Sequence, residues 1–400
     1  MISQSDRPFN STTQSAQPGQ VIILWGTGLG PVSGDEAGGP LPGNIPGLDI
    51  HVYVAGVEAQ IQYSGRSGCC VGDDQIVFVV PAGVQGCALP VYVQIGAVIS
   101  NFVTMAVGPD ASSCPNPDAL SGSLLATAQK NGGLTIGEVS VSRNIGIQAD
   151  GTMHRNDNVS AVFEFDPLVY FEPGAAVAAV TPVGACTVIQ FPGSAGAGGV
   201  GGALPKGLAA GNVSAATPVG TYPVPPTQGQ PGYYGLVFFP GYPSPAPAGI
   251  INNGTVLTPG TTVFSWTGEG SIGAGQASID FPLTFMWTNE ASVTTIDTSQ
   301  PLTITWSGGT KGATLYIYIQ SSAAIGIGAE LTCAADATLG TFTIPSSLLA
   351  ALPPSIVVSN ISMASIALTE SFVGSFTAPG IDLGQTLFDD GVDKGGIVVQ

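Results

Sequence analysis

The sequence predicts an all-β protein made of tandem β-sandwich domains joined by long loops rich in glycine and proline. Short runs of β-branched and aromatic residues recur along the 400-residue chain, and clusters of turn residues separate them. The 57 glycines and 32 prolines supply these turns. A hydrophobic fraction of 44% is too high for a disordered chain, so we expect the runs to form strands around folded cores.

The first domain is predicted over residues 18–115, after a polar N-terminal arm over residues 1–17. It opens with the apolar run Val-Ile-Ile-Leu-Trp at residues 21–25, a pattern typical of a buried strand. Glycines at positions 26, 28 and 30 permit positive φ and predict a tight turn directly after this strand. Further strands are expected at residues 49–54, 57–63, 75–80, 89–95 and 97–107. Six or seven strands in about 100 residues are typical of an immunoglobulin-like (Ig-like) sandwich.

Several of these segments resemble a known domain. The motifs Gly26-Thr-Gly-Leu-Gly-Pro, Asp74-Gln-Ile-Val-Phe-Val-Val-Pro and Ser100-Asn-Phe-Val-Thr resemble the TIG/IPT-like domain of secreted acidobacterial paralogous families. Later segments resemble the same proteins, among them Gly133-Leu-Thr-Ile-Gly-Glu-Val and Leu302-Thr-Ile-Thr-Trp-Ser. The resemblance implies a secreted protein with an Ig-like first domain, and it implies no particular activity.

The remaining chain is predicted as a central β domain with Gly/Pro/Tyr-rich loops over residues 116–281 and a C-terminal β-sandwich over residues 282–400. One short helix is expected at residues 121–130, and residues 217–249 are expected to form a long exposed loop. The tail, residues 395–400, is expected to be a short strand without a partner nearby in sequence. Other strands are expected at residues 134–142, 159–165, 187–191, 263–266, 277–281, 283–287, 302–306, 313–320, 341–344, 356–358, 365–368 and 375–378.

Charge and composition narrow the classes of partner. The formal net charge is −18, from 26 acidic and 8 basic residues, which argues against nucleic acid and against anionic membrane surfaces. No run of 18 apolar residues occurs, so no membrane insertion is expected. Charged residues make up only 8% of the chain, against about a quarter in an ordinary soluble domain. Such a surface loses little hydration when another copy packs against it.

The six cysteines predict disulfide bonds, because they form no CxxC motif and the chain has few histidines for a zinc site. Cys69, Cys70, Cys87 and Cys114 are expected to form two bridges within the first domain, with the vicinal Cys69 and Cys70 bonded to different partners. Cys186 and Cys333 then form a bridge between the later domains. We therefore expect an extracellular or cell-surface protein, although the polar residues 1–13 do not form a signal peptide.

Motifs for catalysis or ligand binding are weak. Two G-x-G-x-x-G matches, at residues 196–201 and 268–273, open no helical pattern, so no nucleotide cofactor is expected. His51 and His154 are expected to be structural or solvated rather than catalytic. Three carboxylates around a glycine at residues 389–393 suit a calcium ion, but the segment lacks the full EF-hand pattern and no metal ligand is assigned.

We expect a non-catalytic secreted structural protein, a subunit of an extracellular fibre or cell-surface assembly whose partners are copies of itself. Residues 1–17 and 391–400 are candidate donor strands for the sheet edge of a neighbouring copy. The alternative is a monomeric adhesin or carbohydrate-binding protein that recognises polysaccharide or other surface proteins. Its candidate interaction surface is aromatic and consists of Tyr233, Tyr234, Phe238, Phe239 and Tyr242. A glycoside hydrolase with an unrecognised carboxylate pair is the third alternative.

Overall fold

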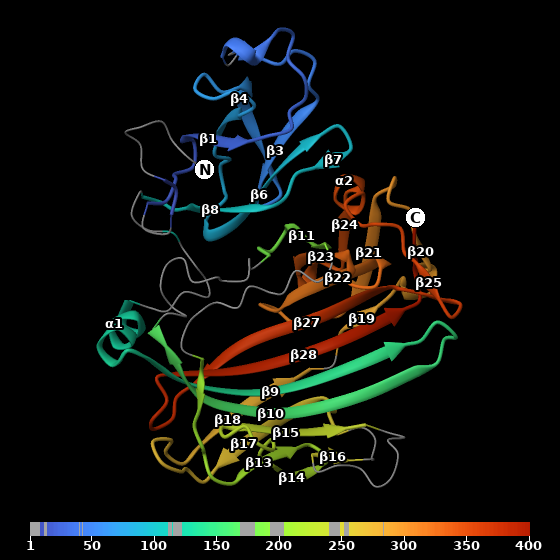
Figure 1. Ribbon diagram of the computed structural model, residues 1–400. Helices are drawn as coiled ribbons and strands as arrows, with labels where there is room; N and C mark the ends of the chain where they lie inside the picture. Colours follow the sequence, from blue (N-terminus) through green and yellow to red (C-terminus); the bar gives the residue numbers. More distant parts are fainter. Residues whose placement is uncertain are drawn as a thin grey trace.

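The computed structural model describes residues 9–11, 14–39, 41, 43–110, 114, 122–168, 181–192, 204–239, 249–251, 256–282 and 284–400. Strands predominate in these residues, beside two short α-helices, α1 (Gly122–Asn131) and α2 (Ser346–Leu349). The predicted all-β fold class is confirmed, and Figure 1 shows several separate β-sheets. Among the described residues, neither helix has the length and apolar character needed to span a lipid bilayer.

The N-terminal domain is an eight-stranded sheet that folds over itself. Strand β4 causes the fold, because its first residues pair with β3 and its later residues pair with β5. The enclosed core includes Val52, Val54, Phe78 and Val91, all of which are buried. The strands are β1 (Val21–Gly26), β2 (Gly43–Asn44), β3 (Ile50–Val54), β4 (Val57–Arg66), β5 (Asp74–Val79), β6 (Gly86–Ile95), β7 (Val98–Ile99) and β8 (Val103–Val107).

A ten-stranded sheet forms the centre of the remaining chain. Its order is β11-β23-β22-β27-β28-β9-β10-β15-β16, with β12 paired to β10. Figure 1 shows the long strands β27, β28, β9 and β10 side by side in the middle of the molecule. The ten strands are β9 (Gly133–Ile147), β10 (Met153–Pro167), β11 (Cys186–Pro192), β12 (Lys206–Gly207), β15 (Tyr233–Phe238), β16 (Ile250–Ile251), β22 (Thr314–Ala324), β23 (Ile327–Asp336), β27 (Ala364–Phe376) and β28 (Leu383–Gly395).

The boundary expected between residues 281 and 282 does not separate two sheets. Strand β28 pairs in parallel with β9 over twelve positions, from Leu383 opposite Ile136 to Lys394 opposite Ile147. This pairing joins strands from the two expected domains into one sheet. Parallel pairing between strands so far apart in sequence leaves no local pattern, so sequence periodicity alone does not predict it.

Two smaller sheets cover one face of the ten-stranded sheet. Phe388 and Val392 are four residues apart on β28, so their side chains point to the same face of the ten-stranded sheet. Phe388 belongs to the core shared with the four-stranded sheet, whereas Val392 packs against the core shared with the three-stranded sheet. The first small sheet contains β14 (Gly220–Val224), β13 (Val213–Thr217), β17 (Gly260–Trp266) and β18 (Gly275–Phe281), and the second contains β19 (Met286–Trp287), β21 (Leu302–Ser307) and β24 (Thr341–Ile344).

Both described chain ends pack against their own chain. At the C-terminus, β29 (Val398–Val399) pairs in parallel with β20 (Thr295–Ile296), and Ile397 and Val399 are buried in the core. At the N-terminus, Ala16 forms a bridge with Val107 of β8 and is buried. The expectation that residues 391–400 form a free donor strand is therefore wrong, and the described part of the N-terminal arm is also docked. Residues 1–8 lie outside the described part of the chain.

Candidate functional site

The aromatic residues expected at an interaction surface lie mostly inside the protein. Tyr233, Tyr234 and Phe238 belong to β15, and Tyr234 and Phe238 are buried in the core beneath the four-stranded sheet. The Tyr234 hydroxyl accepts a hydrogen bond from the Ala210 N–H at 2.9 Å. Tyr233 donates to a Glu164 carboxylate oxygen, and this hydrogen bond raises the pKa of Tyr233 to about 12.

These contacts correct the prediction for residues 217–249. That segment contains β14 and β15 rather than one long exposed loop, because Tyr234, Leu236 and Phe238 alternate toward the core. Phe239 is half-buried, and Tyr242 lies outside the described residues. The four described aromatic residues are therefore buried or half-buried, and they do not form an exposed stacking surface.

The carboxylates at residues 389–393 lie on a central strand and not in a calcium-binding loop. Asp390 faces the core, where Arg143 Nε donates to its Oδ1 at 2.6 Å and Arg143 Nη2 donates to its Oδ2 at 2.5 Å. Asp389 and Asp393 point to the opposite face of β28 because strand residues alternate. This arrangement does not bring the three carboxylates to one ion.

The two histidines lie on strands of different sheets. His51 lies on β3 between two carboxylates, with Nδ1 at 2.6 Å from Glu58 Oε1 and Nε2 at 3.2 Å from Asp49 Oδ1. The hydrogen bond to Glu58 raises the pKa of the imidazole. His154 lies at the exposed start of β10.

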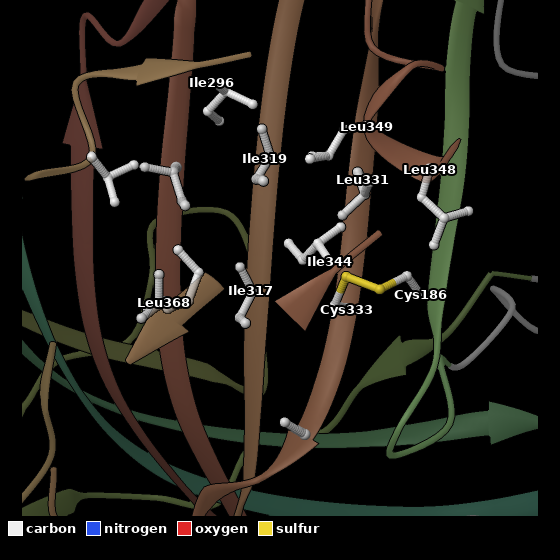
Figure 2. Close-up of a cluster of buried hydrophobic side chains, with 14 of the residues drawn as sticks. Cys186, Ile296, Ile317, Ile319, Leu331, Cys333, Ile344, Leu348, Leu349 and Leu368 are labelled. Atoms are coloured by element: carbon white, nitrogen blue, oxygen red, sulfur yellow. A yellow bond between two sulfur atoms is a disulfide. The ribbon is translucent and has the colours of Figure 1, made fainter. Parts of the chain in front are cut away.

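All six cysteines form disulfide bonds. Cys186 bonds to Cys333, as the sequence analysis expects. Cys87 bonds to Cys114, a pairing that the sequence analysis does not expect. Figure 2 shows the Cys186–Cys333 bridge inside the core, near Ile317, Ile344 and Leu331. Cys69 bonds to its neighbour Cys70, so the expectation of different partners for these two residues is wrong. Asp73 lies beside this pair, and because the two sulfurs are bonded to each other they are not available as thiolate ligands for a metal ion.

The exposed edge of the ten-stranded sheet carries an unusual apolar surface. Strand β11 is the last strand at this edge, and its Ile189 and Phe191 side chains are 57% and 37% exposed. Strand β23 pairs with β11, and the turn that precedes β23 carries Ile325, which is 95% exposed. Ile327, the first residue of β23, is opposite Pro192 and is also exposed. We call Ile189, Phe191, Ile325 and Ile327 the apolar edge.

A hairpin extends the apolar edge. Its strands, β25 (Val357–Val358) and β26 (Ile361–Ser362), expose Val357, Val358 and Ile361. The Ile356 N–H donates to the Ser322 carbonyl at 2.9 Å, and the Ser322 N–H donates to the Met363 carbonyl at 3.1 Å. Because Ser322 lies near the end of β22, these bonds hold the hairpin close to the Ile325 turn.

Several other sheet edges in the described residues are better protected against pairing. Strand β16 has only two residues, β14 contains Pro223, and β18 carries Asp280. Short length, proline and charge all discourage the addition of another strand. Strand β11 has seven residues and no charge, its one proline is the last residue of the strand, and its residues 189–191 are exposed whereas residues 186–188 are buried. The uncharged edge strands β8 and β24 are shorter, with five and four residues. Strand β1 is also an uncharged edge, but its residues 22–25 are half-buried.

The sequence analysis predicts a strand at residues 187–191 but not its position at an edge. The order of strands in the sheet depends on pairings between segments that are distant in sequence. Strand β11, for example, pairs with β23, and Cys186 lies opposite Cys333. One local signal was present, because the segment from Cys186 to Pro192 is apolar, uncharged and followed by a glycine-rich stretch.

Comparisons with known proteins place the chain in no family. No family model matches it, and no curated protein is similar to it. Solved structures align only weakly. The four N-terminal Ig domains of Dscam1 isoform 4.44 are 8% identical, with 87% of this chain and 92% of that chain covered and a TM-score of 0.18. The titin I-band fragment I67–I69 is 7% identical, with 98% of each chain covered and a TM-score of 0.15.

A third alignment is to a Bacteroides ovatus protein from a mixed-linkage glucan utilization locus, SGBP-B, in complex with a mixed-linkage heptasaccharide. It is 10% identical, with 85% of this chain and 73% of that chain covered and a TM-score of 0.16. Scores this low carry no argument about fold or function. The resemblance to TIG/IPT-like domains accordingly stays a prediction from sequence motifs, and the β-sandwich architecture rests on the strands and cores described above.

Proposed function

We propose that this chain is a non-catalytic extracellular structural protein whose copies associate through the apolar edge. The observation that carries the proposal is strand β11, a seven-residue uncharged sheet edge with exposed Ile189 and Phe191. An exposed apolar edge strand is a template for pairing with another chain. Three disulfide bonds support an extracellular location, because such bonds persist in oxidising compartments.

A second copy suits this edge better than a charged partner does. The net charge of −18 makes copies repel one another at long range, so a contact between them must lie where the local charge is low. Strand β11 meets this condition because it carries no charge. Antiparallel pairing of the exposed residues 189–191 of two β11 strands about Gln190 places Ile189 of each copy opposite Phe191 of the other. The two ten-stranded sheets then form one continuous sheet across a two-fold axis.

The proposal is tested by sedimentation velocity over a concentration series without reductant, followed by negative-stain electron microscopy of the concentrated samples. The wild-type protein is expected to dimerise as its concentration rises, because a two-fold contact closes at the dimer. Ile189→Lys puts one lysine from each copy into the apolar contact beside the proposed axis, and like charges brought together there cost several kcal/mol. We expect this variant to associate about 100-fold more weakly.

A matched control is Val219→Lys, which changes an exposed valine in the β13–β14 turn and should leave association unchanged. Wild-type protein that stays monomeric at every concentration would contradict the proposal and favour a monomeric adhesin. Equal weakening by both lysine variants would also contradict it, because the effect would then follow net charge and not position.

A further inference from the structure

A separate cleft of about 1170 Å³ lies in the N-terminal domain. It lies between the two ends of the folded sheet, with β1 on one side and β7 and β8 on the other. The sheet does not close at this seam, because β1 pairs with β5 and β7 pairs with β6. The lining includes the aliphatic side chains of both walls, among them Leu24, Ile76, Val93, Ile95, Ile99 and Val103.

The turn after β1, which forms part of one wall of the cleft, is held by a buried polar network. The Leu29 N–H donates to Asp74 Oδ2 at 2.7 Å, and Arg66 Nη2 donates to the Gly30 carbonyl at 2.9 Å. Arg66 also forms an ion pair with Asp74. Gly28 and Gly30 have φ of 105° and 109°, so this path of the chain requires glycine. The network keeps the wall in place without a ligand.

The same side of the cleft carries the vicinal disulfide, in the loop that precedes Asp74 of β5. The Ser67 N–H donates to the Asp73 carbonyl at 2.8 Å, and the Ser67 hydroxyl donates to the Cys70 carbonyl at 3.2 Å. These bonds and the Cys69–Cys70 bond restrain the loop that borders the cleft. Two neighbouring segments on this side of the cleft are therefore restrained, the turn after β1 and the loop before β5.

The chemistry of the lining favours an aliphatic chain over a sugar ring. A sugar is best held by flat aromatic side chains that are free to stack on it. The lining contains two aromatic residues, Trp25 and Tyr92, and Tyr92 stacks on Tyr53 at a centroid distance of 4.9 Å within another core. Polar lining groups are few, and Trp25 Nε1 is buried without a hydrogen-bond partner. Pockets with mostly apolar walls and a few polar groups are typical of small-molecule sites.

Charge at the cleft restricts which polar head group a bound aliphatic ligand can carry. Asp73 and Asp74 are the charged residues of the lining, and Asp74 is paired with Arg66. Asp73 disfavours an anionic head group. We propose that the cleft binds the aliphatic chain of an amphiphile that has an uncharged or cationic head group.

The test is a titration of the intact protein with n-alkyl maltosides of six to twelve carbons below their micelle concentrations, followed by calorimetry. Each methylene buried in the cleft should tighten the Kd by about fourfold, the factor that corresponds to the transfer of one CH₂ from water. At equal chain length, an alkyltrimethylammonium should bind more tightly than an alkanoate. Val98→Asp places a charge on the exposed apolar rim and should weaken binding by about tenfold.

Val57→Asp is the matched control, because Val57 is an exposed valine of the same domain outside the lining. The proposal is overturned if Kd does not depend on chain length, or if binding begins only where micelles form. Competition by maltose alone would also overturn it, because the sugar head would then be the ligand. Equal loss of binding in both valine variants would show that the effect is not specific to the cleft.

Discussion

Arg143 and Asp390 form a buried ion pair although they lie 247 positions apart in the sequence. Arg143 comes from β9 and Asp390 from β28, so the pair joins the two strands at the centre of the ten-stranded sheet. Burial raises the pKa of Asp390 to about 6, although the attraction of Arg143 opposes this shift. The desolvation of Asp390 therefore outweighs the attraction, as is common for buried pairs.

Removal of one partner of the Arg143–Asp390 pair should lower the free energy of unfolding more than removal of both partners. Arg143→Met leaves Asp390 buried without its cation, and we expect the free energy of unfolding to fall by about 3–5 kcal/mol. The double variant Arg143→Met with Asp390→Leu should recover much of this loss, because no unpaired charge remains. Urea unfolding of the three proteins measures both values. A double variant less stable than the single variant would contradict this account.

Raised carboxyl pKa values also predict how stability depends on pH. Burial raises the pKa of Asp390 and Asp166 to about 6, and it raises the pKa of Glu138, Asp389 and Asp393 as well. The folded state then binds more protons than the unfolded state between about pH 4 and pH 6, so stability falls as the pH rises through this window.

We expect a higher Tm at pH 5 than at pH 8, measured by calorimetry in buffers of equal ionic strength. Asp166→Asn removes one of the shifted groups and should reduce the difference between the two values. Exposed aspartates with lowered pKa, such as Asp297 and Asp336, act in the opposite direction only at lower pH. A Tm that rises from pH 5 to pH 8 would be incompatible with these shifts.

At the scale of elements, the C-terminal strand acts as part of the core. Ile397 and Val399 are each 1% exposed, and the Val398 N–H donates to the Thr294 carbonyl at 3.0 Å. Deletion of residues 397–400 should lower the free energy of unfolding by about 3–5 kcal/mol, the worth of two buried aliphatic side chains and their hydrogen bonds. Deletion of residues 1–8 is the comparison. Chemical unfolding of both truncations distinguishes the two roles of residues 397–400. If these residues were a donor strand for another copy, their deletion would leave stability unchanged and abolish association.

The sequence predicted many strands because their local patterns are strong. Strand β22 alternates Leu315, Ile317 and Ile319 toward the core, and its prediction at residues 313–320 is confirmed. Strand β28 was missed because Asp389, Asp390 and Asp393 resemble a solvated turn. Only the fold supplies Arg143 as a partner for Asp390, so the sequence gives no local sign that this carboxylate is buried.

The candidate site was less predictable than the fold. Whether a strand lies at a sheet edge depends on the complete strand order, and the order here includes a parallel pairing between β9 and β28. Similarly, the sequence around Tyr234 suggested an exposed loop because glycine, proline and tyrosine are common in loops. The burial of Tyr234 and Phe238 beneath the four-stranded sheet depends on strands β13, β14 and β17, which come from other parts of the chain.

At the scale of the whole molecule, the low density of charge and the position of the apolar edge lead to the same expectation. Charged residues are 8% of the chain, and β11 has none. Most remaining edges of the described sheets carry proline, charge or very short strands, or are half-buried, and the uncharged edge strands β8 and β24 are shorter than β11. One face of the molecule is therefore expected to dominate association between copies.

The most direct test of this central claim is hydrogen–deuterium exchange over a concentration series. Pairing between copies would protect the outward N–H groups of β11, so peptides over residues 186–192 should exchange more slowly as concentration rises. Peptides over β14, residues 220–224, should exchange at a constant rate and serve as the internal control. Association in which β11 exchange stays constant while another edge becomes protected would contradict the account.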